Sequence, residues 1–434
     1  MRFRIKVSTK KSAALQTALL RLVLSVAVAS TLVSLVVVAS SQRPRGRVVS
    51  ANDYPGQDLG ARINAADKAL GSGFGEIVAK GGGVISTQVI ISSDHVLRLL
   101  PGTYATRTSN IPILLKSRAS LIGSGWESIV LESTAKGQFT VISAYSQTIL
   151  NGNPDSGLVI RDVQIRGANP DFNSAPQAVS LGNCSNCLVD KVWINGTRSI
   201  GVQLGGSSST GHFAENSKVT NCLFTRVASQ NLALVNGRNI TFEGNRFLAS
   251  GQRGGPGSTN IDLEPNEAND HIENVVIRNN FIDVHESEMP TTGNGIAVQA
   301  TTGTKYVGPI LIEGNTIIGG SNRGIITNVL SNGIYVFGST MRDVTIRNNA
   351  ITRTGQSGIR IEGTQIKVLN NQLTDVGGGG IPGFVVQATY SEVVGNSFTF
   401  SGNQPADSTI VVLPGSGKNT FQNNRGFQLT GDTR

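Results

Sequence analysis

Two acidic residues, Asp262 and Glu264, are separated by a single leucine in the short apolar segment NIDLEP. If this segment is a β-strand, both side chains lie on one face, roughly 6.6 Å apart along the strand. Carboxyl groups about 6.5–9.5 Å apart are typical of inverting glycoside hydrolases, in which one is the acid and the other activates water. The same oxygens could instead bind Ca²⁺. Asp262 and Glu264 are therefore candidate catalytic residues and candidate calcium ligands, with no other cofactor indicated.

Other side chains could complete either chemistry. If calcium neutralised the carboxylate of a uronate, a nearby base could remove the adjacent proton and cause β-elimination or epimerisation. The candidates for this base are His271, Tyr335 and Arg360. The candidate substrate-binding residues are Gln203, Arg253, Gln299 and Glu362.

A simpler interpretation stands beside each of these roles. Acidic residues on an exposed strand are most often only solvated. Arg360 could pair with Glu264 or Glu362, and His271 lies in a polar stretch where solvent exposure is the ordinary expectation. Arg253 lies in the loop GQRGGPGS and could either contact a substrate carboxylate or remain in solvent.

These residues are far apart in the chain, so a regular scaffold must bring them together. Segments of the form small-apolar-x-apolar occur at 201–204, 231–234, 260–263, 295–298, 333–336, 358–361 and 383–386. In a strand the apolar residues point inward and the x positions outward. Stacked in register, the outward residues would form the column Gln203, Ala233, Asp262, Ala297, Tyr335, Arg360 and Val385. Two residues later a second column would contain Gly205, Val235, Glu264, Gln299, Phe337, Glu362 and Gln387.

A second repeated pattern predicts this stacking. The phrase apolar-x-apolar-x-polar-Asn ends at Asn245, Asn280, Asn315, Asn349, Asn371, Asn396 and Asn424, with spacings of 22 to 35 residues. Such a period with strand-like alternation indicates a solenoid. Stacked coils are roughly 4.8 Å apart, so an inward Asn can hydrogen-bond to the Asn of the next coil. Upstream, Val163, Val192 and Cys222 occupy the same position, so aliphatic or thiol groups should replace the amides there.

Insertions of variable length fall beside the predicted outward columns. They cover residues 248–259, 265–274, 283–294, 299–309 and 316–332, whereas the coil between Asn349 and Asn371 has almost none. Loops on one side of a rigid solenoid can form the walls of a cleft, and functional residues concentrate on such loops. The columns around Asp262 are therefore the predicted site.

The N-terminus divides the chain into three parts. Residues 1–47 contain nine Lys or Arg residues, no acidic residue and the apolar run Leu22–Ala39, which predicts a signal peptide or an uncleaved membrane anchor. Residues 48–57, with Pro55 and Gly56, are interpreted as a linker. Residues 58–434 are then the solenoid domain, on the outside of the cytoplasm: secreted, periplasmic or at the cell surface.

Charge argues against a nucleic-acid partner. The chain has 37 basic and 28 acidic residues, but removing the nine basic residues of the leader leaves 28 of each sign. A nearly neutral domain lacks the basic surface that binds phosphate backbones. Fifty-two glycines and few aromatic residues are instead typical of a turn-rich all-β chain.

The solenoid should begin with a helix. In residues 58–70, Leu59, Ile63, Ala66 and Leu70 recur at helical spacing, and Gly71 follows as a stop signal. A short amphipathic helix at this place would cover the open end of the apolar core.

Three segments here carry a resemblance to a known family. Ala-Asp-x-Ala-Leu at 66–70, Gly-Gly-Gly-Val-Ile at 81–85 and Leu-x-Leu-x-Pro-Gly-Thr-Tyr at 97–104 resemble the N-terminal part of the pectate-lyase-like superfamily. The resemblance covers about residues 58–425 and implies a right-handed single-stranded parallel β-helix. The superfamily includes polysaccharide lyases, glycoside hydrolases, uronate epimerases and phage tailspikes, so it implies a polysaccharide partner but no single reaction.

The chain departs from the family's best-known catalytic motifs. Residues 191–196 look like the Trp-Ile-Asp-His stretch of pectate lyases, but Asn195 and Gly196 replace the Asp-His pair. The Arg-x-Pro-x-x-Arg motif of pectate lyases and the polygalacturonase motifs are missing. The prediction is therefore an exported β-helix lyase, hydrolase or epimerase acting on an acidic or substituted glycan. The alternative is a non-catalytic cell-surface or glycan-binding β-helix.

Overall fold

The computed structural model describes residues 46–108, 111–132, 140–167, 177–197, 199–249, 259–284, 293–300, 303–319, 331–377, 380–402 and 406–431. Residues 1–45 of the predicted leader, and Arg253, therefore lie outside the described residues. Residues 48–434 form one compact unit. Among the described residues, no helix is both long enough and apolar enough to cross a membrane.

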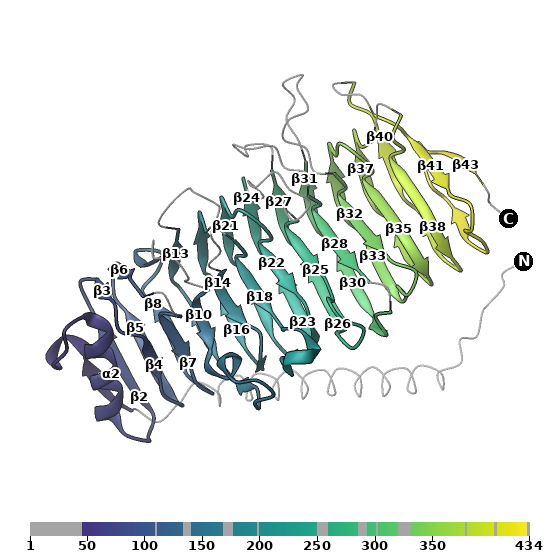
Figure 1. Ribbon diagram of the computed structural model, residues 1–434. Helices are drawn as coiled ribbons and strands as arrows, with labels where there is room; N and C mark the ends of the chain where they lie inside the picture. Colours follow the sequence, from purple (N-terminus) through teal and green to yellow (C-terminus); the bar gives the residue numbers. More distant parts are fainter. Residues whose placement is uncertain are drawn as a thin grey trace, which may run out of the picture. The chain divides into compact units, whose positions relative to one another are not determined.

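The unit is built from three long parallel sheets, here called A, B and C (Figure 1). Sheet A contains β1 (Arg47–Ser50), β2 (Gly75–Ala79), β5 (His95–Leu99), β8 (Ser120–Gly123), β11 (Asp155–Ser156), β12 (Val159–Arg161), β15 (Cys184–Ser185), β16 (Leu188–Asp190), β19 (Ala214–Glu215), β20 (Lys218–Thr220), β23 (Gly237–Glu243), β26 (His271–Arg278), β29 (Tyr306–Val307), β30 (Ile310–Glu313), β33 (Val344–Arg347), β36 (Lys367–Leu369), β39 (Glu392–Val394) and β42 (Thr420–Gln422).

Sheet B contains β3 (Gly83–Ile85), β6 (Gly102–Thr106), β9 (Ser128–Leu131), β13 (Gln164–Arg166), β17 (Trp193–Asn195), β21 (Leu223–Thr225), β24 (Arg246–Leu248), β27 (Phe281–Asp283), β31 (Thr316–Ile318), β34 (Ala350–Thr352), β37 (Gln372–Thr374) and β40 (Ser397–Thr399). Sheet C contains β4 (Val89–Ile91), β7 (Ile113–Leu115), β10 (Thr140–Ala144), β14 (Gln177–Leu181), β18 (Val202–Leu204), β22 (Leu232–Leu234), β25 (Ile261–Leu263), β28 (Ile296–Gln299), β32 (Ile334–Phe337), β35 (Ile359–Thr364), β38 (Phe384–Thr389), β41 (Thr409–Val412) and β43 (Gln428–Gly431).

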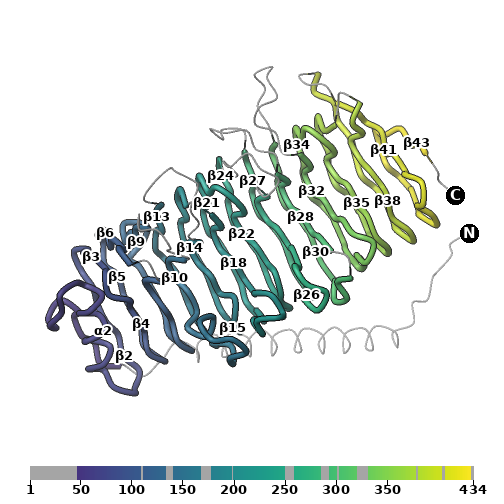
Figure 2. Tube along the Cα trace, in the orientation of Figure 1, coloured from purple at the N-terminus to yellow at the C-terminus, as the bar shows by residue number. Residues whose placement is uncertain are grey.

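Each coil contributes strands to A, B and C in turn, and the next coil repeats the path one strand spacing further along the axis (Figure 2). Inward apolar side chains therefore stack in rows. One such row in sheet A runs through Ile160, Val189, Val219, Phe242, Ile277, Ile312, Ile346, Val368 and Val393, all fully buried. Burying each aliphatic side chain stabilises the fold by about 1.5–3 kcal/mol, so this repeated row is a major part of the core. The predicted parallel β-helix is confirmed.

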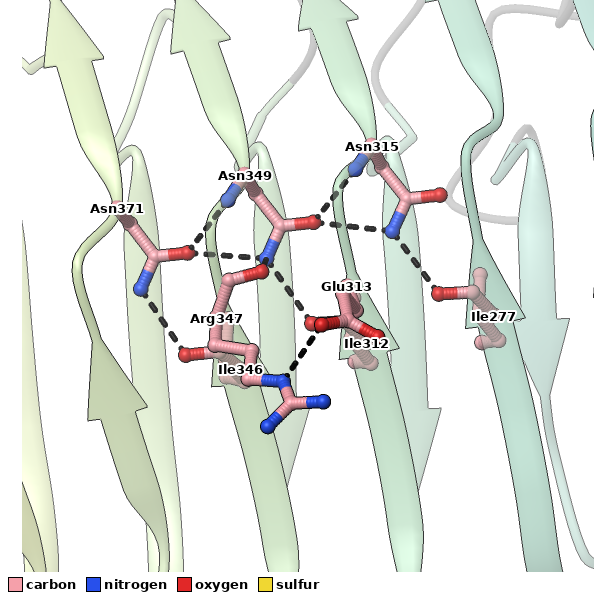
Figure 3. A network of polar contacts seen from close by, with 8 residues as sticks. All are labelled: Ile277, Ile312, Glu313, Asn315, Ile346, Arg347, Asn349 and Asn371. Atoms are coloured by element: carbon pink, nitrogen blue, oxygen red, sulfur yellow. Dashed lines mark hydrogen bonds and ion pairs between the residues drawn. The ribbon is translucent and has the colours of Figure 1, made fainter. Parts of the chain in front are cut away.

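The asparagine ladder is present in the turns from sheet A to sheet B. Each ladder Asn from Asn245 to Asn396 donates its side-chain amide to the Oδ1 of the next ladder Asn, at 2.9–3.0 Å, and the ladder ends at Asn424. Each also donates its amide to a carbonyl oxygen of the preceding coil, as Asn349 does to Ile312 at 3.0 Å (Figure 3). The backbone N–H of Cys222 donates to Asn245 Oδ1, and the strand register aligns Val163 and Val192 with Cys222, as predicted.

The residue before each ladder Asn explains the rest of the repeated phrase. This residue has a left-handed backbone before every ladder Asn from Asn245 to Asn424, with φ between 54° and 70°, as at Asn279, Asn348 and Gly244. Gly and Asn adopt this conformation at least cost. The turn therefore needs Gly or Asn at this position in most coils, and an inward Asn immediately after it.

The predicted capping helix is α2 (Leu59–Leu70). Asp58 is its N-cap and accepts a hydrogen bond from the Ala61 N–H at 2.9 Å, while Leu59, Ile63 and Ala66 are buried. On the side facing the first coil, Asn64 accepts from the N–H of Ile90, and Asp67 accepts from the N–H of Ser92. The helix thus occupies both the apolar end of the core and the open hydrogen-bonding edge of β4.

The prediction of a linker over residues 48–57 was wrong for its first half. Residues 47–50 form β1, Ala51–Asp53 form the short 3-10 helix η1, and Val49 and Ala51 are buried in the core. The adjacent β-branched residues Val48 and Val49 favour a strand, and the turn signals Pro55 and Gly56 come only after it.

Candidate functional site

The predicted outward column exists. Strand pairing aligns Gln203, Ala233, Asp262, Ala297, Tyr335, Arg360 and Val385 on sheet C. Figure 1 shows the strands that carry them, from β18 to β38, lying side by side. In the second column, Gln299 is aligned with Phe337, and Glu362 is aligned with Gln387. The second column therefore also forms at these positions. Residues about 150 positions apart thereby share one surface.

A second set of stacked asparagines holds these strands. Asn231 donates its amide to Asn260 Oδ1 at 3.0 Å, Asn260 donates to the carbonyl of Asn294 at 3.3 Å, and Asn332 donates to Asn294 Oδ1 at 3.0 Å. These residues lie one or two positions before the strands β22, β25, β28 and β32 of sheet C, respectively. The sequence contains the signal as an Asn one or two residues before the apolar triplet, but it was not recognised as a stack.

Asp262 is the most unusual residue of the column, because it points outward yet is only 2% exposed. Its carboxyl group accepts hydrogen bonds from Gln299 Nε2 at 2.9 Å and from Gln230 Nε2 at 3.4 Å. Burial raises the pKa of Asp262 to about 7, and the charge of Glu264 adds to the rise. The two glutamine amides oppose it but do not cancel it. Asp262 therefore carries a proton for much of the time near neutral pH.

Glu264 is half-buried beside Asp262, and the two carboxyl groups share a hydrogen bond. Burial also raises the pKa of Glu264, although the hydrogen bond from Asp262 lowers it in part. Such a contact leaves no room for a water between the carboxyl groups, unlike the about 6.5–9.5 Å separation of an inverting pair. The pair is instead one acid and one carboxylate that share a proton.

The donor set does not fit calcium. Ca²⁺ takes about six to eight oxygen ligands, whereas the acidic donors here are two, and the neighbouring glutamines direct N–H groups towards Asp262. Within the described part of the chain, no group of three or more His, Cys, Asp or Glu side chains could hold a metal ion.

Tyr335, Arg360 and Glu362 form a second cluster, two coils further along the column. Arg360 binds Glu362 with a 2.9 Å ion pair, and its guanidinium lies over the Tyr335 ring at 5.3 Å. The Tyr335 hydroxyl donates to Glu362 at 3.4 Å, and its ring stacks on Phe337 at 5.1 Å. Burial raises the pKa of Tyr335, so this phenol is not prepared to act as a base. The cluster is better suited to binding a sugar ring than to removing a proton.

Gln203 lies two coils on the other side of Asp262. Its Oε1 accepts from Gln177 Nε2 at 2.5 Å, and its own amide donates to the Gly205 carbonyl. The column therefore offers amide groups on one side of the acid pair and an aromatic and charged cluster on the other.

His271 does not belong to this column. It begins β26 in sheet A, hydrogen-bonds to Glu273 at 2.8 Å and stacks on Tyr306 with ring centroids 4.0 Å apart. The seven residues that separate Leu263 from His271 carry the chain around the corner from sheet C to sheet A, which the sequence pattern did not reveal. The predicted role of His271 as a base for this site does not fit that position.

Gln230 was missed by the sequence analysis. It precedes Asn231, outside the small-apolar-x-apolar segment, and reaches Asp262 on the next coil. Only the in-register stacking of β22 and β25 makes the two neighbours.

Comparisons with known proteins agree with this architecture. A family model described as "Right handed beta helix region" matches residues 148–340. The mannuronan C-5 epimerase AlgE6 A-module of Azotobacter vinelandii superposes with a TM-score of 0.58 at 15% identity, over 88% of this chain and 94% of its own. A GH87 α-1,3-glucanase from Streptomyces thermodiastaticus gives 0.54 at 15% identity, over 90% and 71%.

The DFA-IIIase of Arthrobacter chlorophenolicus gives a TM-score of 0.54 at 13% identity, over 87% of this chain and 94% of its own. No curated protein matches the chain by sequence. At these identities the likeness concerns the fold, and it confirms the handedness that the family resemblance implied. The chain is a right-handed parallel β-helix protein.

Proposed function

We propose that this protein is an exported enzyme that cleaves glycosidic bonds in a polysaccharide bound along sheet C, with Asp262 and Glu264 as its catalytic pair. The observation that carries the proposal is the buried, proton-sharing contact between these two carboxyl groups on an outward column. The similar structures include a polysaccharide epimerase and a glucanase, which supports a glycan as the substrate.

Asp262 would be the general acid. With a pKa of about 7, Asp262 is protonated in a large fraction of the molecules at neutral pH, and a protonated carboxyl can donate to the leaving glycosidic oxygen. Glu264 would be the carboxylate that stabilises the positive charge developing at the anomeric carbon, while the attacking water approaches from the open side of sheet C and not from between the two carboxyl groups. Gln299 and Gln230 orient Asp262 through their amide N–H groups.

Hydrolysis fits these residues better than the uronate chemistries. Elimination and epimerisation need a cation beside the sugar carboxylate and a base for the neighbouring carbon. The described neighbours of Asp262 are Gln299, Gln230 and Glu264. Arg360, the cation of the column, is three coils away from Asp262 and already pairs with Glu362.

The test uses the full-length protein with polygalacturonate, polymannuronate and α-1,3-glucan, measuring new reducing ends and the ultraviolet absorbance of unsaturated uronates. Hydrolysis produces reducing ends without that absorbance. Both Asp262→Asn and Glu264→Gln should abolish the formation of reducing ends. The control is Asp94→Asn, which changes a partly exposed carboxylate that directly precedes β5 and pairs with Arg118.

Four outcomes would contradict the proposal. Unsaturated products would show a lyase, and an altered sugar configuration without new ends would show an epimerase. Binding without turnover on any glycan would instead support the non-catalytic alternative. Retention of full turnover by both variants would move the site away from this pair.

A further inference from the structure

The two tryptophans of the chain lie together on a different face of the molecule. Trp126 follows β8, and Trp193 begins β17 on sheet B, with ring centroids 5.3 Å apart and planes tilted by 55°. Trp126 is 41% exposed, which is unusual for so large an apolar side chain. This pair has no place in the site on sheet C.

Both indole rings are held rigidly, with their polar atoms already satisfied. Trp126 donates its N–H to the carbonyl of Lys191 at 3.1 Å, and Trp193 donates to Thr225 Oγ1 at 2.8 Å. The exposed parts of the rings are therefore purely apolar. Rigid aromatic surface of this kind contributes contact area at little entropic cost on binding.

The outward column of sheet B continues from this pair. Strand register aligns Trp193 with Leu223, Arg246 and Phe281 on successive coils. Arg166 lies on the coil before Trp193 and is aligned with Asn195, two residues further along the strand on the same face of sheet B. Figure 1 shows β13, β21, β24 and β27 of this sheet in sequence along the axis. At about 4.8 Å per coil, the strip from Arg166 to Phe281 is roughly 19 Å long.

The two arginines of this strip differ from those of sheet A. On sheet A, Arg98, Arg238, Arg278 and Arg347 each form an ion pair of 2.6–2.9 Å with a glutamate of the neighbouring coil, as Figure 3 shows for Arg347 and Glu313. Exposed Arg166 instead hydrogen-bonds to Gln164, and exposed Arg246 lies over the Phe281 ring at 5.6 Å. Among the described residues neither has a carboxylate partner.

An anion is therefore the complement that this face lacks. A guanidinium presents a planar fork that matches a carboxylate in two hydrogen bonds. Asp283 lies beyond Phe281 at the far end, so the cationic stretch is confined to the coils from Arg166 to Arg246. Its chemistry combines flat apolar rings with positive charges on one face of sheet B, in two adjacent outward columns.

We propose that this strip, consisting of Trp126, Trp193, Leu223, Arg166, Arg246 and Phe281, is a second glycan-binding site that takes a carboxylated polysaccharide lying along the helix axis. The rings contact the apolar faces of the sugars, and the arginines bind their carboxylates. The site is independent of the acid pair, since it lies on another sheet. It would hold the protein on an acidic polymer whatever reaction sheet C performs.

The experiment is native affinity electrophoresis of the full-length protein in gels with polygalacturonate or with neutral dextran. We expect retardation by polygalacturonate only, weakening as salt rises. The double variant Arg166→Gln/Arg246→Gln should bind about fivefold or more weakly, as expected for two exposed ion pairs, and Trp126→Ala should also weaken binding. Arg278→Gln removes the same charge from a paired arginine on sheet A and is the matched control. Mobility in gels without polysaccharide corrects for charge and verifies folding.

Each contrary result overturns the proposal. If the double variant binds polygalacturonate as tightly as the wild type, or if Arg278→Gln weakens binding equally, the strip is not the site. Equal retardation by dextran would show that the arginines do not select a carboxylate. If sedimentation shows a dimer that the strip variants dissociate, the face binds a second copy of the chain instead. Since Asp262 and Glu264 are untouched in every variant, turnover on sheet C is scored separately.

Discussion

The Asp262→Asn variant should become more stable than the wild type as the pH rises, although the substitution removes the proposed catalytic acid. Burial raises the pKa of this carboxyl from its ordinary value of 3.8 to about 7. The folded protein therefore holds a proton that the unfolded chain releases. The stability due to the neutral form is complete below pH 3.8 and is lost as the pH rises towards 7. Asn has nearly the same shape as Asp and cannot ionise, so the stability of the Asp262→Asn variant does not fall with pH for this reason.

The size of the effect follows from the two pKa values. Each pKa unit corresponds to about 1.4 kcal/mol, so ionising Asp262 in the folded state costs roughly 4 kcal/mol once the pH is above 7. The free-energy difference between Asp262→Asn and the wild type should therefore grow by roughly 3–4 kcal/mol from pH 4 to pH 8 and then level off. The side-chain amide of Asn can donate to Glu264, as the protonated acid does.

The measurement is urea unfolding of both proteins between pH 4 and pH 8. Trp126 and Trp193 report on the coils before the site, and far-ultraviolet circular dichroism reports on all three sheets, so coincident curves would show that the coils unfold together. Asp94→Asn is the control, because its half-exposed carboxylate pairs with Arg118. A difference between Asp262→Asn and the wild type that does not change with pH would refute the reasoning.

Three other predictions concern different parts of the molecule. Asn349→Ala removes the hydrogen-bond partners of the buried N–H of Asn315 and of the carbonyl of Ile312, so it should lower the free energy of unfolding by roughly 2–6 kcal/mol. Asn424→Ala, at the partly exposed end of the ladder, should lower it far less. Equal losses of stability in urea unfolding would contradict the ladder's role. Asp58→Ala should cost about 1–2 kcal/mol as the loss of an N-cap, and because hydrogen bonds lower the pKa of Asp58, the loss should shrink in acid, as melting at pH 3 and pH 7 would show. Arg360→Gln should raise KM on a bound glycan more than it lowers kcat, and a fall in kcat alone would place Arg360 in the chemical step instead.

The sequence was sufficient to predict the register of the coils, for a physical reason. From Asn245 to Asn424 the ladder Asn and the left-handed residue before it recur in successive coils, so the phrase marks the same turn wherever it occurs. Alternation then determines which residues point outward, and the column from Gln203 to Val385 follows. The apolar face of α2 could also be predicted from the sequence, because helical spacing and a stop at Gly71 are local signals.

The properties that depend on neighbouring coils could not be predicted from the sequence. Nothing in NIDLEP distinguishes a solvated Asp262 from a buried one, because its burial and its contact with Gln230 arise from side chains on other coils. His271 was misplaced because the pattern does not say where a loop turns from one sheet to the next. The contact between Trp126 and Trp193 joins residues 67 positions apart through the same coil stacking.

The position of the acid pair along the shaft is itself explained by stability. An ionisable side chain that lies on the outward face of a sheet but is covered by its neighbours destabilises the coil that carries it. The surrounding backbone must then be held by other interactions. The coils of β22, β25, β28 and β32 carry the second set of stacked asparagines beside sheet C, and three of them also contain a ladder Asn of the first set. Amide hydrogen bonds at two corners of these coils fix the strands while leaving the outward face free for polar residues. The raised pKa of Asp262, on which the proposed function depends, thus occurs where hydrogen bonds at two corners of the coil support the backbone.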